Sequence, residues 1–491
     1  MDPVVSIIPW LAVLVSLVGA GAVIALGRRP DLREGASLLA GGVKLILVLS
    51  MLPVVWSGGV VVYRVVELLP GVSISFRVDG LGLLFGGVAS FLWIVTTVYS
   101  MGYMRSLNEH SQTRYFACFA VSLTGALGVA FSGNLFTLFL FYEILTFVTY
   151  PLVIHHETPE AFAGGRKYMV YLLGTSKTFL LAAMLLTYVA AGTLDFKPGG
   201  LFPAGTDPML VTVIYILFLA GLTKAAMMPF HNWLPTAMVA PTPVSALLHA
   251  VAVVKVGVFS IVRVMVDVFG VDLLGQLGLG IPTAFFVSIT IILASVIALS
   301  QDNLKARLAY STVSQLSYVV LGAALLTPGG LLGSVMQIAG HAFGKITLFF
   351  AAGAIYVAAH MTKISEMSGL ARRMPWTMGA FTIGALSLIG VPPLAGFASK
   401  WWLAVGSIEA KQIGILVVLL SSTLLNAAYF LPILYKAYFE PLPGTVGAEA
   451  SSGIHEAPWT MVAPLVVTAA GTILVGFYSD TLLILARQVI R

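Results

Sequence analysis

The 491-residue chain has few charged residues, since Asp, Glu, Lys and Arg together make up only 9% of it. Soluble domains carry about 25%, so this deficit excludes an ordinary soluble protein. Hydrophobic residues make up 59% of the sequence, and the mean hydropathy is +0.99. Both values indicate a polytopic membrane protein. The formal net charge of +6 is small for this length and lies in loops, so it bears on membrane orientation rather than on nucleic-acid binding.

Cysteine is also nearly absent. The single cysteine, Cys118, excludes disulfides within the chain and leaves iron–sulfur clusters without ligands. The sequence contains no HExxH, CxxC or P-loop motif, and the small-residue cluster Gly19-Ala20-Gly21 lies in an apolar run rather than after a strand. We therefore expect no cofactor and no metal.

Apolar runs dominate what is present. A run of about 20 apolar residues spans a bilayer as a helix, and these runs predict an all-α polytopic membrane protein with about fourteen transmembrane helices. The predicted ranges are 4–26, 36–56, 80–101, 115–132, 134–155, 165–192, 209–229, 243–266, 281–300, 308–326, 331–358, 377–404, 412–438 and 459–484. Residues 59–78 are too mixed to span, and their alternation predicts a short surface hairpin.

Lysine and arginine are unevenly distributed among the predicted loops. Loops that follow odd-numbered helices carry more of these residues than loops that follow even-numbered helices. The positive-inside rule then places the odd loops in the cytoplasm and both termini outside.

Six lysines fall within predicted helices, although a lysine at the centre of a membrane helix costs about 2.5–3.5 kcal/mol on the insertion scale. They are Lys44, Lys177, Lys224, Lys255, Lys345 and Lys400. Lys44 lies near the cytoplasmic end of its helix, so we expect it to snorkel to the surface. Glu143 is the only acid expected deep inside a helix. A lysine would hold it ionised, and we expect it to pair with Lys224 or another buried lysine; a purely structural ion pair is the alternative.

Two predicted helices are interrupted by proline. Pro229 breaks the seventh helix after Lys224, and Pro392-Pro393 break the twelfth before Lys400. Breaks five helices apart predict two five-helix repeats of opposite orientation, as in inverted-repeat transporters. The expected organisation is an N-terminal unit with the hairpin, a first repeat, a second repeat and a C-terminal helix, at residues 1–114, 115–266, 281–438 and 459–491.

The buried titratable residues suit proton transfer. A desolvated lysine releases its proton more readily when a nearby carboxylate moves away, and histidine titrates near pH 6.5. The candidate proton pathway comprises Glu143, Lys224, His249, Lys255, His341, Lys345 and Lys400. His341 and Lys345 are four apart and share a helix face, whereas His249 and Lys255 lie about 240° apart around theirs.

Some of these residues have a simpler interpretation. Taken alone, His249 and His341 could each be packing histidines. The polar run on the tenth helix could hold water or make ordinary helix–helix hydrogen bonds; it consists of Ser311, Thr312, Ser314, Gln315 and Ser317. The pair His155-His156 at a helix end is interpreted as a solvated rim.

Four stretches resemble the antiporter-like subunits shared by respiratory complex I, membrane-bound hydrogenases and Mrp-type Na+/H+ antiporters. They are HNWLPTAMVAPTPVSALLHAVAVVKVGVF (231–259), QDNLKARLAYSTVSQLSYVVLG (301–322), HAFGKITLFFAAGAI (341–355) and GVPPLAGFASK (390–400). Within this family, residues 231–259 and 426–439 are most similar to the D subunit of Mrp antiporters.

The resemblance implies roles for single positions. Glu143 matches the glutamate of the fifth helix, and Lys224 matches its ion-pair partner in the broken seventh helix. The remaining pathway positions match as Lys255 on the eighth helix, His249 nearby, His341 and Lys345 in the eleventh-helix motif, and Lys400 at the twelfth-helix site. Lys177 has no counterpart in the family pattern, which puts in doubt whether the pathway is lined identically.

The implied function is proton translocation within a multisubunit inner-membrane complex of a prokaryote, with Na+/H+ antiport of the Mrp type. The implied partners are other membrane subunits, protons, Na+ and the lipid bilayer, without nucleic acid and without catalytic chemistry in this chain. The alternatives are a proton-pumping subunit of a redox-driven complex (NADH-quinone oxidoreductase or membrane-bound hydrogenase), a self-sufficient transporter, and a subunit that itself holds haem or quinone.

Overall fold

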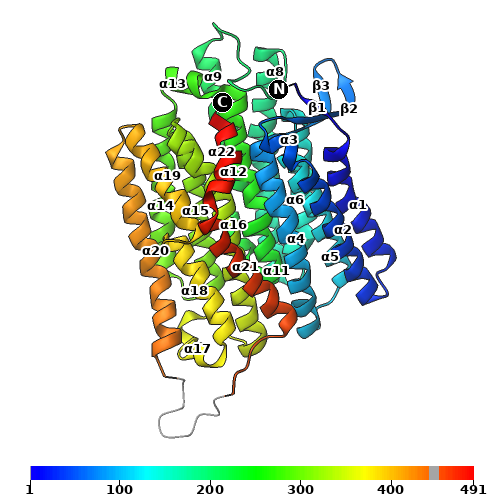
Figure 1. Cartoon of the computed structure of the whole chain (residues 1–491), viewed down its shortest axis with the longest axis vertical. Coiled ribbons are helices and arrows are strands. Elements are labelled where there is room, and N and C mark those ends of the chain that lie inside the picture. Colours follow the sequence, from blue (N-terminus) through cyan, green and yellow to red (C-terminus); the bar gives the residue numbers. More distant parts are fainter. Residues whose placement is uncertain (1, 442–452, 491) are drawn as a thin grey trace.

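The computed structural model describes residues 2–441 and 453–490 and is a tall bundle of helices (Figure 1). Both chain ends lie at the same end of the bundle, which also carries its three strands (Figure 1). Met1, residues 442–452 and Arg491, which fall within or between the predicted units, lie outside the described residues.

The first half of the chain forms helices in three groups. The long helices before the first break are α1 (Ile8–Ala25), α2 (Pro30–Ser50), α3 (Leu52–Trp56), α4 (Gly80–Ser106), α5 (Gln112–Ala130), α6 (Leu135–Val153), α7 (Pro159–Thr175), the π-helical η1 (Ser176–Leu180), α8 (Leu181–Ala191) and α9 (Pro208–Gly221). Short turns follow: η2 (Thr223–Ala225), α10 (Trp233–Thr236) and η3 (Ala237–Val239). The next span combines α11 (Thr242–Ala246), the π-helical η4 (Leu247–Val251), α12 (Val253–Arg263) and the π-helical η5 (Val264–Phe269), before α13 (Val271–Gln276).

The second half is more regular. Its helices are α14 (Gly280–Ser300), α15 (Leu304–Ala324), α16 (Pro328–Ala359), η6 (Ile364–Glu366), α17 (Leu370–Arg373), α18 (Pro375–Ile389), α19 (Ala395–Glu409), α20 (Ile413–Phe439), α21 (Trp459–Phe477), α22 (Ser479–Ala486) and η7 (Arg487–Ile490). Each of the fourteen predicted ranges coincides with one or more of these helices. Eleven helices of the described residues are long and apolar enough to cross a membrane, and α9 and α18 are shorter apolar helices. The fold is therefore a mostly helical membrane protein, while the number fourteen stays a prediction.

The predicted surface hairpin is present. Strands β2 (Val61–Leu69) and β3 (Val72–Val78) pair antiparallel, with Val61 opposite Val78. Gly71 occupies the turn at φ +75°, a left-handed conformation that glycine adopts without steric cost. β1 (Val4–Val5) adds a short parallel strand beside β2, so the first helix begins at Ile8 rather than at the predicted residue 4.

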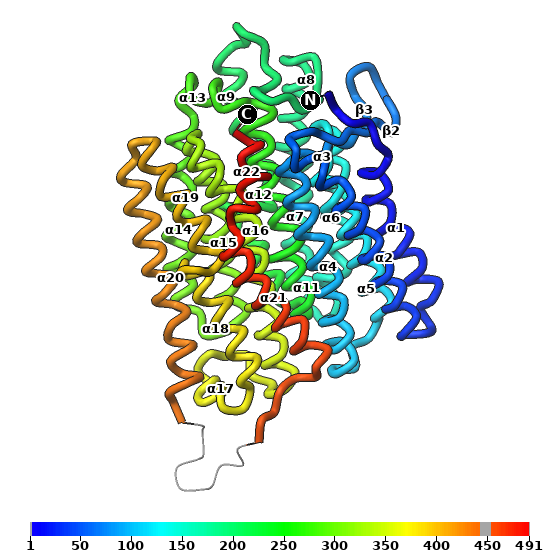
Figure 2. The backbone as a smooth tube through the Cα atoms, in the orientation of Figure 1, coloured from blue at the N-terminus to red at the C-terminus, as the bar shows by residue number. Residues whose placement is uncertain are grey.

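The centre of the bundle is formed by α16 and the span from Thr242 to Phe269. α16 packs against α4, α11, α15, α18, α19 and α21, and it runs through the middle of the traced backbone (Figure 2). In the most apolar part of the Thr242–Phe269 span every residue is buried. Charged residues on these two elements are therefore enclosed by protein rather than exposed to lipid.

The expectation that Lys44 snorkels is wrong. Its side chain is fully buried, Nζ donates a hydrogen bond to the carbonyl oxygen of Leu123 at 3.2 Å, and the ammonium lies 4.9 Å from the Trp93 ring centroid. The reason is the start of α2 at Pro30 instead of residue 36. At 1.5 Å per residue, Lys44 then lies about 20 Å from the helix start, beyond the reach of its side chain to that end.

The expectation that Glu143 is the only deeply placed acid is also wrong. Glu34 on α2 is fully buried and accepts hydrogen bonds from Arg33 at 2.8 Å and Arg105 at 2.5 Å. Asp267 in η5 is 5% exposed and is paired with Arg263 at 2.6 Å. Both acids lie beyond the predicted helix ends, where the real helices extend further.

Both predicted helix breaks are present. α18 ends at Ile389 and α19 begins at Ala395, on either side of Pro392-Pro393. α9 ends at Gly221, earlier than the predicted break at Pro229.

Side chains satisfy the backbone that the break after α9 leaves without helical hydrogen bonds. Trp233 Nε1 donates to the Thr223 carbonyl oxygen at 3.1 Å, and the Met228 N–H donates to Thr290 Oγ1 at 3.2 Å. Irregular backbone is tolerated at membrane depth where protein groups supply such partners.

Candidate functional site

Glu143 on α6 pairs with Lys177, not with Lys224. Its carboxylate Oε2 lies 3.1 Å from Lys177 Nζ, and the two side chains are 7% and 50% exposed. Lys177 lies in the π-helical turn η1 and also sits 4.9 Å from the Phe139 ring centroid. The predicted Glu143–Lys224 pair is therefore wrong. A π-helical turn contains one residue more than an α-helical turn, so side-chain directions around Lys177 do not follow the regular 3.6-residue period.

Lys224 is enclosed by the same turn of α6 that carries Glu143. It is fully buried in η2, and Nζ donates to the Tyr142 carbonyl oxygen at 2.8 Å and to Thr146 Oγ1 at 2.6 Å. Its backbone N–H donates to the Tyr142 hydroxyl at 3.1 Å. The broken helix thus fixes Lys224 at both ends, through one tyrosine and one threonine of α6.

Gly257 on α12 allows this close packing. A Cβ at Gly257 would lie 2.2 Å from the Ala225 nitrogen and 2.3 Å from the Lys224 carbonyl carbon. Real Cβ atoms do not approach other atoms within 3.0 Å. Only glycine lets α12 touch the backbone of η2, and this contact holds Lys224 against α6.

His249 lies in the π-helical turn η4, next to the point where the helix is distorted. Its side chain is fully buried, and neither ring nitrogen has a hydrogen-bond partner within the described part of the chain. The ring centroid lies 4.8 Å from that of Phe349 on α16. Ala252, between His249 and Lys255, leaves helical geometry at φ −120° and ψ −77°, so the 240° separation predicted for an ideal helix does not describe these two residues.

Lys255 and His341 form a direct contact between the two central elements. Lys255 Nζ on α12 lies 2.6 Å from His341 Nδ1 on α16, and both side chains are 1% exposed. His341 Nε2 has no partner among the described residues. An ammonium beside an imidazole nitrogen can donate its proton to that nitrogen without large movement of either group.

Lys345 lies one turn after His341 on α16. Its ammonium donates to the Leu308 carbonyl oxygen at 2.9 Å and to the Ser311 hydroxyl, both on α15. Ser311 belongs to the polar run of the predicted tenth helix. Most other hydroxyls of that run turn back to their own helix, as Ser317 does toward the Val313 carbonyl oxygen at 3.1 Å.

Lys400 on α19 reaches back to the second helix break. Nζ donates to the carbonyl oxygens of Leu388 and Ile389 at 2.9 and 2.7 Å, which the end of α18 leaves without helical partners. In the amide orientation that satisfies both its ends, Asn426 also accepts from Lys400 Nζ and from Gln315 Nε2, each at 3.0 Å.

A chain of neutral polar groups lies between α15, α16 and α19. Gln337 Nε2 donates to Gln315 Oε1 at 2.8 Å, and the Ser399 hydroxyl donates to Gln337 Oε1 at 2.5 Å. All three side chains are buried. Through Asn426 and Ser399, this chain adjoins Lys400.

Sequence reasoning missed Tyr142, Thr146, Gln337, Ser399 and Asn426. One signal was present, because Gln337 precedes His341 and Lys345 at intervals of four residues, which places all three on one face of α16. For the others no comparable signal exists, since their roles depend on which helices become neighbours.

The seven predicted residues thus all lie inside the bundle, and the structure joins them in local groups. α6 contacts Lys224, α12 contacts α16 through Lys255 and His341, α16 contacts α15 through Lys345, and the Gln337 chain leads to Lys400. Such a series of buried donors and acceptors, several of them titratable, can exchange protons when water or side-chain rotation bridges neighbouring groups.

A cavity of about 260 Å³ opens where the odd loops meet. It is lined by residues of α4, α15, α16 and their loops, among them Tyr103, Glu109, His156, Thr242 and Lys305. Lys305 Nζ donates to the Ala240 carbonyl oxygen at 2.6 Å at its wall.

The interpretation of His155-His156 as a solvated rim is wrong for His155, which is fully buried. Both histidines face Glu109 in the loop after α4. Burial alone raises the pKa of the Glu109 carboxyl, but hydrogen bonding to His155 and the charges of both histidines outweigh burial and lower it. The pKa of His156 is lowered because burial outweighs the opposing charge of Glu109.

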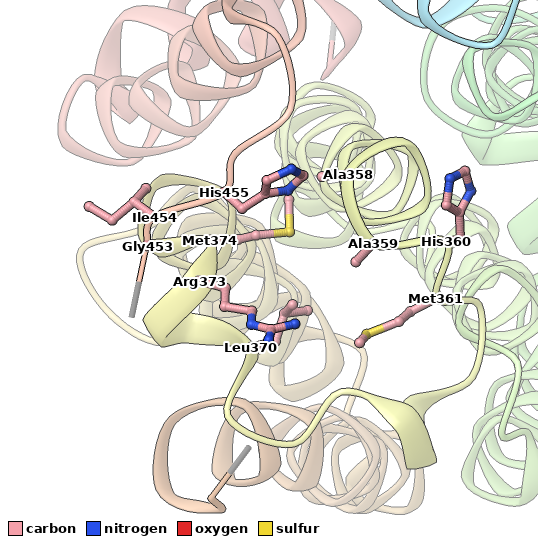
Figure 3. Close-up of a pocket in the computed structure, with 10 residues that line it drawn as sticks. All are labelled: Ala358, Ala359, His360, Met361, Leu370, Arg373, Met374, Gly453, Ile454 and His455. Atoms are coloured by element: carbon pink, nitrogen blue, oxygen red, sulfur yellow. The ribbon is translucent and has the colours of Figure 1, made fainter. Parts of the chain in front are cut away.

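A second cavity, of about 530 Å³, is separate from the predicted pathway. It lies between the end of α16, α17 and the segment before α21, and Figure 3 shows His360, Arg373 and His455 around it. His455 is tied there by its N–H, which donates to the Arg373 carbonyl oxygen at 2.8 Å. None of the seven predicted pathway residues lines it.

Comparison with known proteins assigns the family. Residues 132–426 match the family described as "NADH:quinone oxidoreductase/Mrp antiporter, TM". The chain belongs to this family. All seven predicted pathway residues, from Glu143 to Lys400, fall within the matched range.

Relatives within the family serve different complexes. The chain is 32% identical to "NADH-quinone oxidoreductase subunit N" of Desulforudis audaxviator (strain MP104C), covering 81% of this chain and 80% of that one. It is 31% identical to a probable K(+)/H(+) antiporter protein of Rhizobium meliloti (strain 1021), covering 95% of this chain but 47% of that one. The resemblance to the antiporter-like family is therefore confirmed.

A solved structure supports the same assignment. A chain in "Structure of Mrp complex from Dietzia sp. DQ12-45-1b" superposes with a TM-score of 0.87 at 25% identity, covering 99% of this chain and 96% of that one. The chain is thus an antiporter-like membrane subunit, and its structural relative is part of a multisubunit complex.

Proposed function

We propose that this chain translocates protons as the D-type subunit of an Mrp-like monovalent cation/proton antiporter, with Na+ as the coupled cation. The observation that carries the proposal is the series of buried lysines, histidines and amides that reaches from Glu143 on α6 to Lys400 on α19. Family membership supports the proton pathway, and the similarity of residues 231–259 and 426–439 to Mrp D subunits supports the type of complex.

The proposed path runs parallel to the membrane. A proton would pass from the Glu143 region through Lys224 to Lys255 and His341, then through Lys345 and the Gln337 chain to Lys400. Direct contact exists for Lys255 and His341 at 2.6 Å, and water would bridge the other steps. Buried lysine suits this role because its desolvated charge is costly, so small movements of a neighbouring charge shift its proton affinity.

The two helix breaks would provide access from opposite sides. We assign the predicted repeats, 115–266 and 281–438, as two inverted half-units, each with one broken helix and its lysine, flanked by residues 1–114 and 459–491. The Lys224 break is closed by α6 and the Lys400 break by its own carbonyl oxygens. Release of either contact would open the path to one side.

Transport needs no chemistry in this chain. One charge that crosses the full membrane potential gains about 2.3 kcal/mol per 100 mV. In a prokaryotic cell membrane with odd loops inside and both termini outside, proton influx would then drive cation efflux.

The test is proton-coupled cation exchange in everted vesicles from a host without its own antiporters, with the remaining subunits of the complex expressed alongside. Glu143→Gln and Lys224→Ala should each abolish exchange while the chain still inserts and assembles. Lys44→Ala is the matched control, because Lys44 is equally buried but lies on α2, away from the path. Exchange at the parent rate by both pathway variants would disprove the proposed path.

A proton-pumping role in a redox-driven complex is the second candidate, because the chain is 32% identical to an NADH-quinone oxidoreductase subunit. Purification from the native membrane distinguishes the two. Small hydrophobic subunits and a second antiporter-like chain without redox proteins support the antiporter. Iron–sulfur or nickel subunits support the redox-driven pump.

A further inference from the structure

Three histidines and one glutamate meet at the end of the bundle that carries the odd loops. Glu109 and His110 lie in the loop between α4 and α5, and His155 and His156 follow α6. No sequence motif predicted this site, because the two pairs are separated by a whole helix and fall outside the HExxH and CxxC patterns.

The ligand atoms of this cluster are already close together. One ligand atom each from Glu109, His110 and His155 can be chosen so that all lie within 4.8 Å of one another. His155 Nε2 and His156 Nδ1 each lie 3.6 Å from the same oxygen, Glu109 Oε2. A tetrahedral zinc ion with ligands at about 2.0–2.2 Å separates its ligand atoms by about 3.4 Å. Two edges of the cluster therefore match a zinc tetrahedron within a few tenths of an ångström.

A second observation points to a ligand. His155 is fully buried, yet neither of its ring nitrogens has a hydrogen-bond partner among the described residues. Leaving such a group unsatisfied costs about 1–3 kcal/mol. The nitrogen that faces Glu109 would be satisfied by a shared cation.

The surrounding contacts hold the cluster in place. Gln112 Nε2 donates to the Glu109 carbonyl oxygen at 3.1 Å, and the Glu109 N–H donates to the Met104 carbonyl oxygen at 2.9 Å. Arg114 ties the other strand of the site, because it donates to the His155 carbonyl oxygen at 3.3 Å and pairs with Glu157 at 2.5 Å.

The ring of His110 is aligned as well. It stacks on His155 with centroids 4.8 Å apart and an interplanar angle of 10°. Its Nδ1 contacts Ser111 Oγ at 3.1 Å, which leaves Nε2 for a ligand. A hydrogen bond to the other ring nitrogen is the usual way in which proteins orient a metal-binding histidine.

We propose that Glu109, His110 and His155 bind a divalent transition-metal ion of the zinc class, with His156 as the fourth ligand. Imidazole nitrogens with one carboxylate favour Zn²⁺ over Mg²⁺ and Ca²⁺, which take oxygen ligands. The exposed His110 and the half-buried His156 leave a route for the ion from solvent. Glu109 and His156 also line the 260 Å³ cavity, so the ion would sit at its wall.

The test is zinc binding by the full chain, purified in detergent through a streptavidin-binding tag so that no added histidines interfere. The probe is ZnCl2 alone, titrated against a chromogenic chelator, with X-ray absorption at the zinc edge. Glu109→Gln and His155→Ala are the test variants. His360→Ala and His455→Ala are the matched controls, since both histidines lie in loops predicted to face the same side.

We expect one zinc ion per chain in the parent and the controls, with nitrogen and oxygen neighbours near 2.0–2.2 Å. Each test variant should weaken binding by more than about 100-fold, because even loss of a residue behind the ligands costs about 10–100-fold. If His155→Ala does not yield folded protein, Glu109→Gln decides alone, since its side chain lies at the edge of the cluster. Parent-like affinity in the folded variants, or a zinc ion without histidine neighbours, would overturn the proposal.

Discussion

Gly257→Ala should impair proton transport although it alters no titratable group. The added Cβ would lie 2.2 Å from the Ala225 nitrogen and 2.3 Å from the Lys224 carbonyl carbon. Both atoms belong to backbone, so neither can turn aside as a flexible side chain would. To reach van der Waals contact at about 3.5 Å, η2 and α12 must separate by roughly 1 Å.

This separation acts on Lys224. Its Nζ bonds to Thr146 Oγ1 and to the Tyr142 carbonyl oxygen at 2.6 and 2.8 Å. A shift of roughly 1 Å lengthens both beyond the range of a hydrogen bond. A hydrogen bond to a charged group contributes about 1.5–3 kcal/mol, so loss of both costs about 3 kcal/mol or more. At tenfold per 1.4 kcal/mol, the competent arrangement falls by about 100-fold or more.

The assay is proton-coupled exchange in everted vesicles, with thermal unfolding in detergent measured in parallel. Gly87→Ala on α4 is the matched control, because a Cβ there meets nothing within 4 Å. The control should keep its transport rate and should not lose stability, since alanine favours helix over glycine by about 1 kcal/mol. Parent-like transport by Gly257→Ala would refute the packing of α12 on η2 and its role in holding Lys224.

Two further predictions concern paired groups. Lys255→Ala and His341→Ala should each stop exchange, and the double variant should be no slower than either single one, because the two side chains meet at 2.6 Å and act as a unit; independent, multiplying losses would contradict the contact. Arg263→Met should lower the stability in detergent by about 3–5 kcal/mol, because it leaves Asp79 and Asp267, now bound at 2.5 and 2.6 Å, as buried charges without a partner. Arg64→Ala, which breaks the exposed pair with Glu67, is its control and should change stability by about 1 kcal/mol or less; equal losses from both variants would contradict the reasoning.

Much of the fold was predictable because membrane spans are encoded locally. Apolar runs, the alternation of residues 59–78 and the prolines of the twelfth helix each have one physical meaning in lipid. The position of the first break was less predictable. Pro229 shows that a helix cannot continue through it, but the helix already ends at Gly221, where Trp233 and Tyr142 supply partners for the freed backbone.

The candidate site was predictable in its members but not in its contacts. Lysine, histidine and glutamate in apolar helices are conspicuous at any position. Which of them meet depends on helix neighbours and on π-helical turns such as η1, which carries Lys177 to Glu143. Lys44 shows the same limit, because a helix start six residues earlier than predicted turns a surface lysine into a buried one.

The most direct test of the central claim, that these lysines carry protons rather than only charge, is proton-coupled exchange by Lys255→Arg. Arginine keeps the positive charge but does not release a proton in proteins, since its pKa exceeds about 12. Lys44→Arg is the control, as a buried lysine away from the path. We predict that Lys255→Arg assembles but does not exchange, while Lys44→Arg does both. Exchange at the parent rate by Lys255→Arg would contradict a path through Lys255.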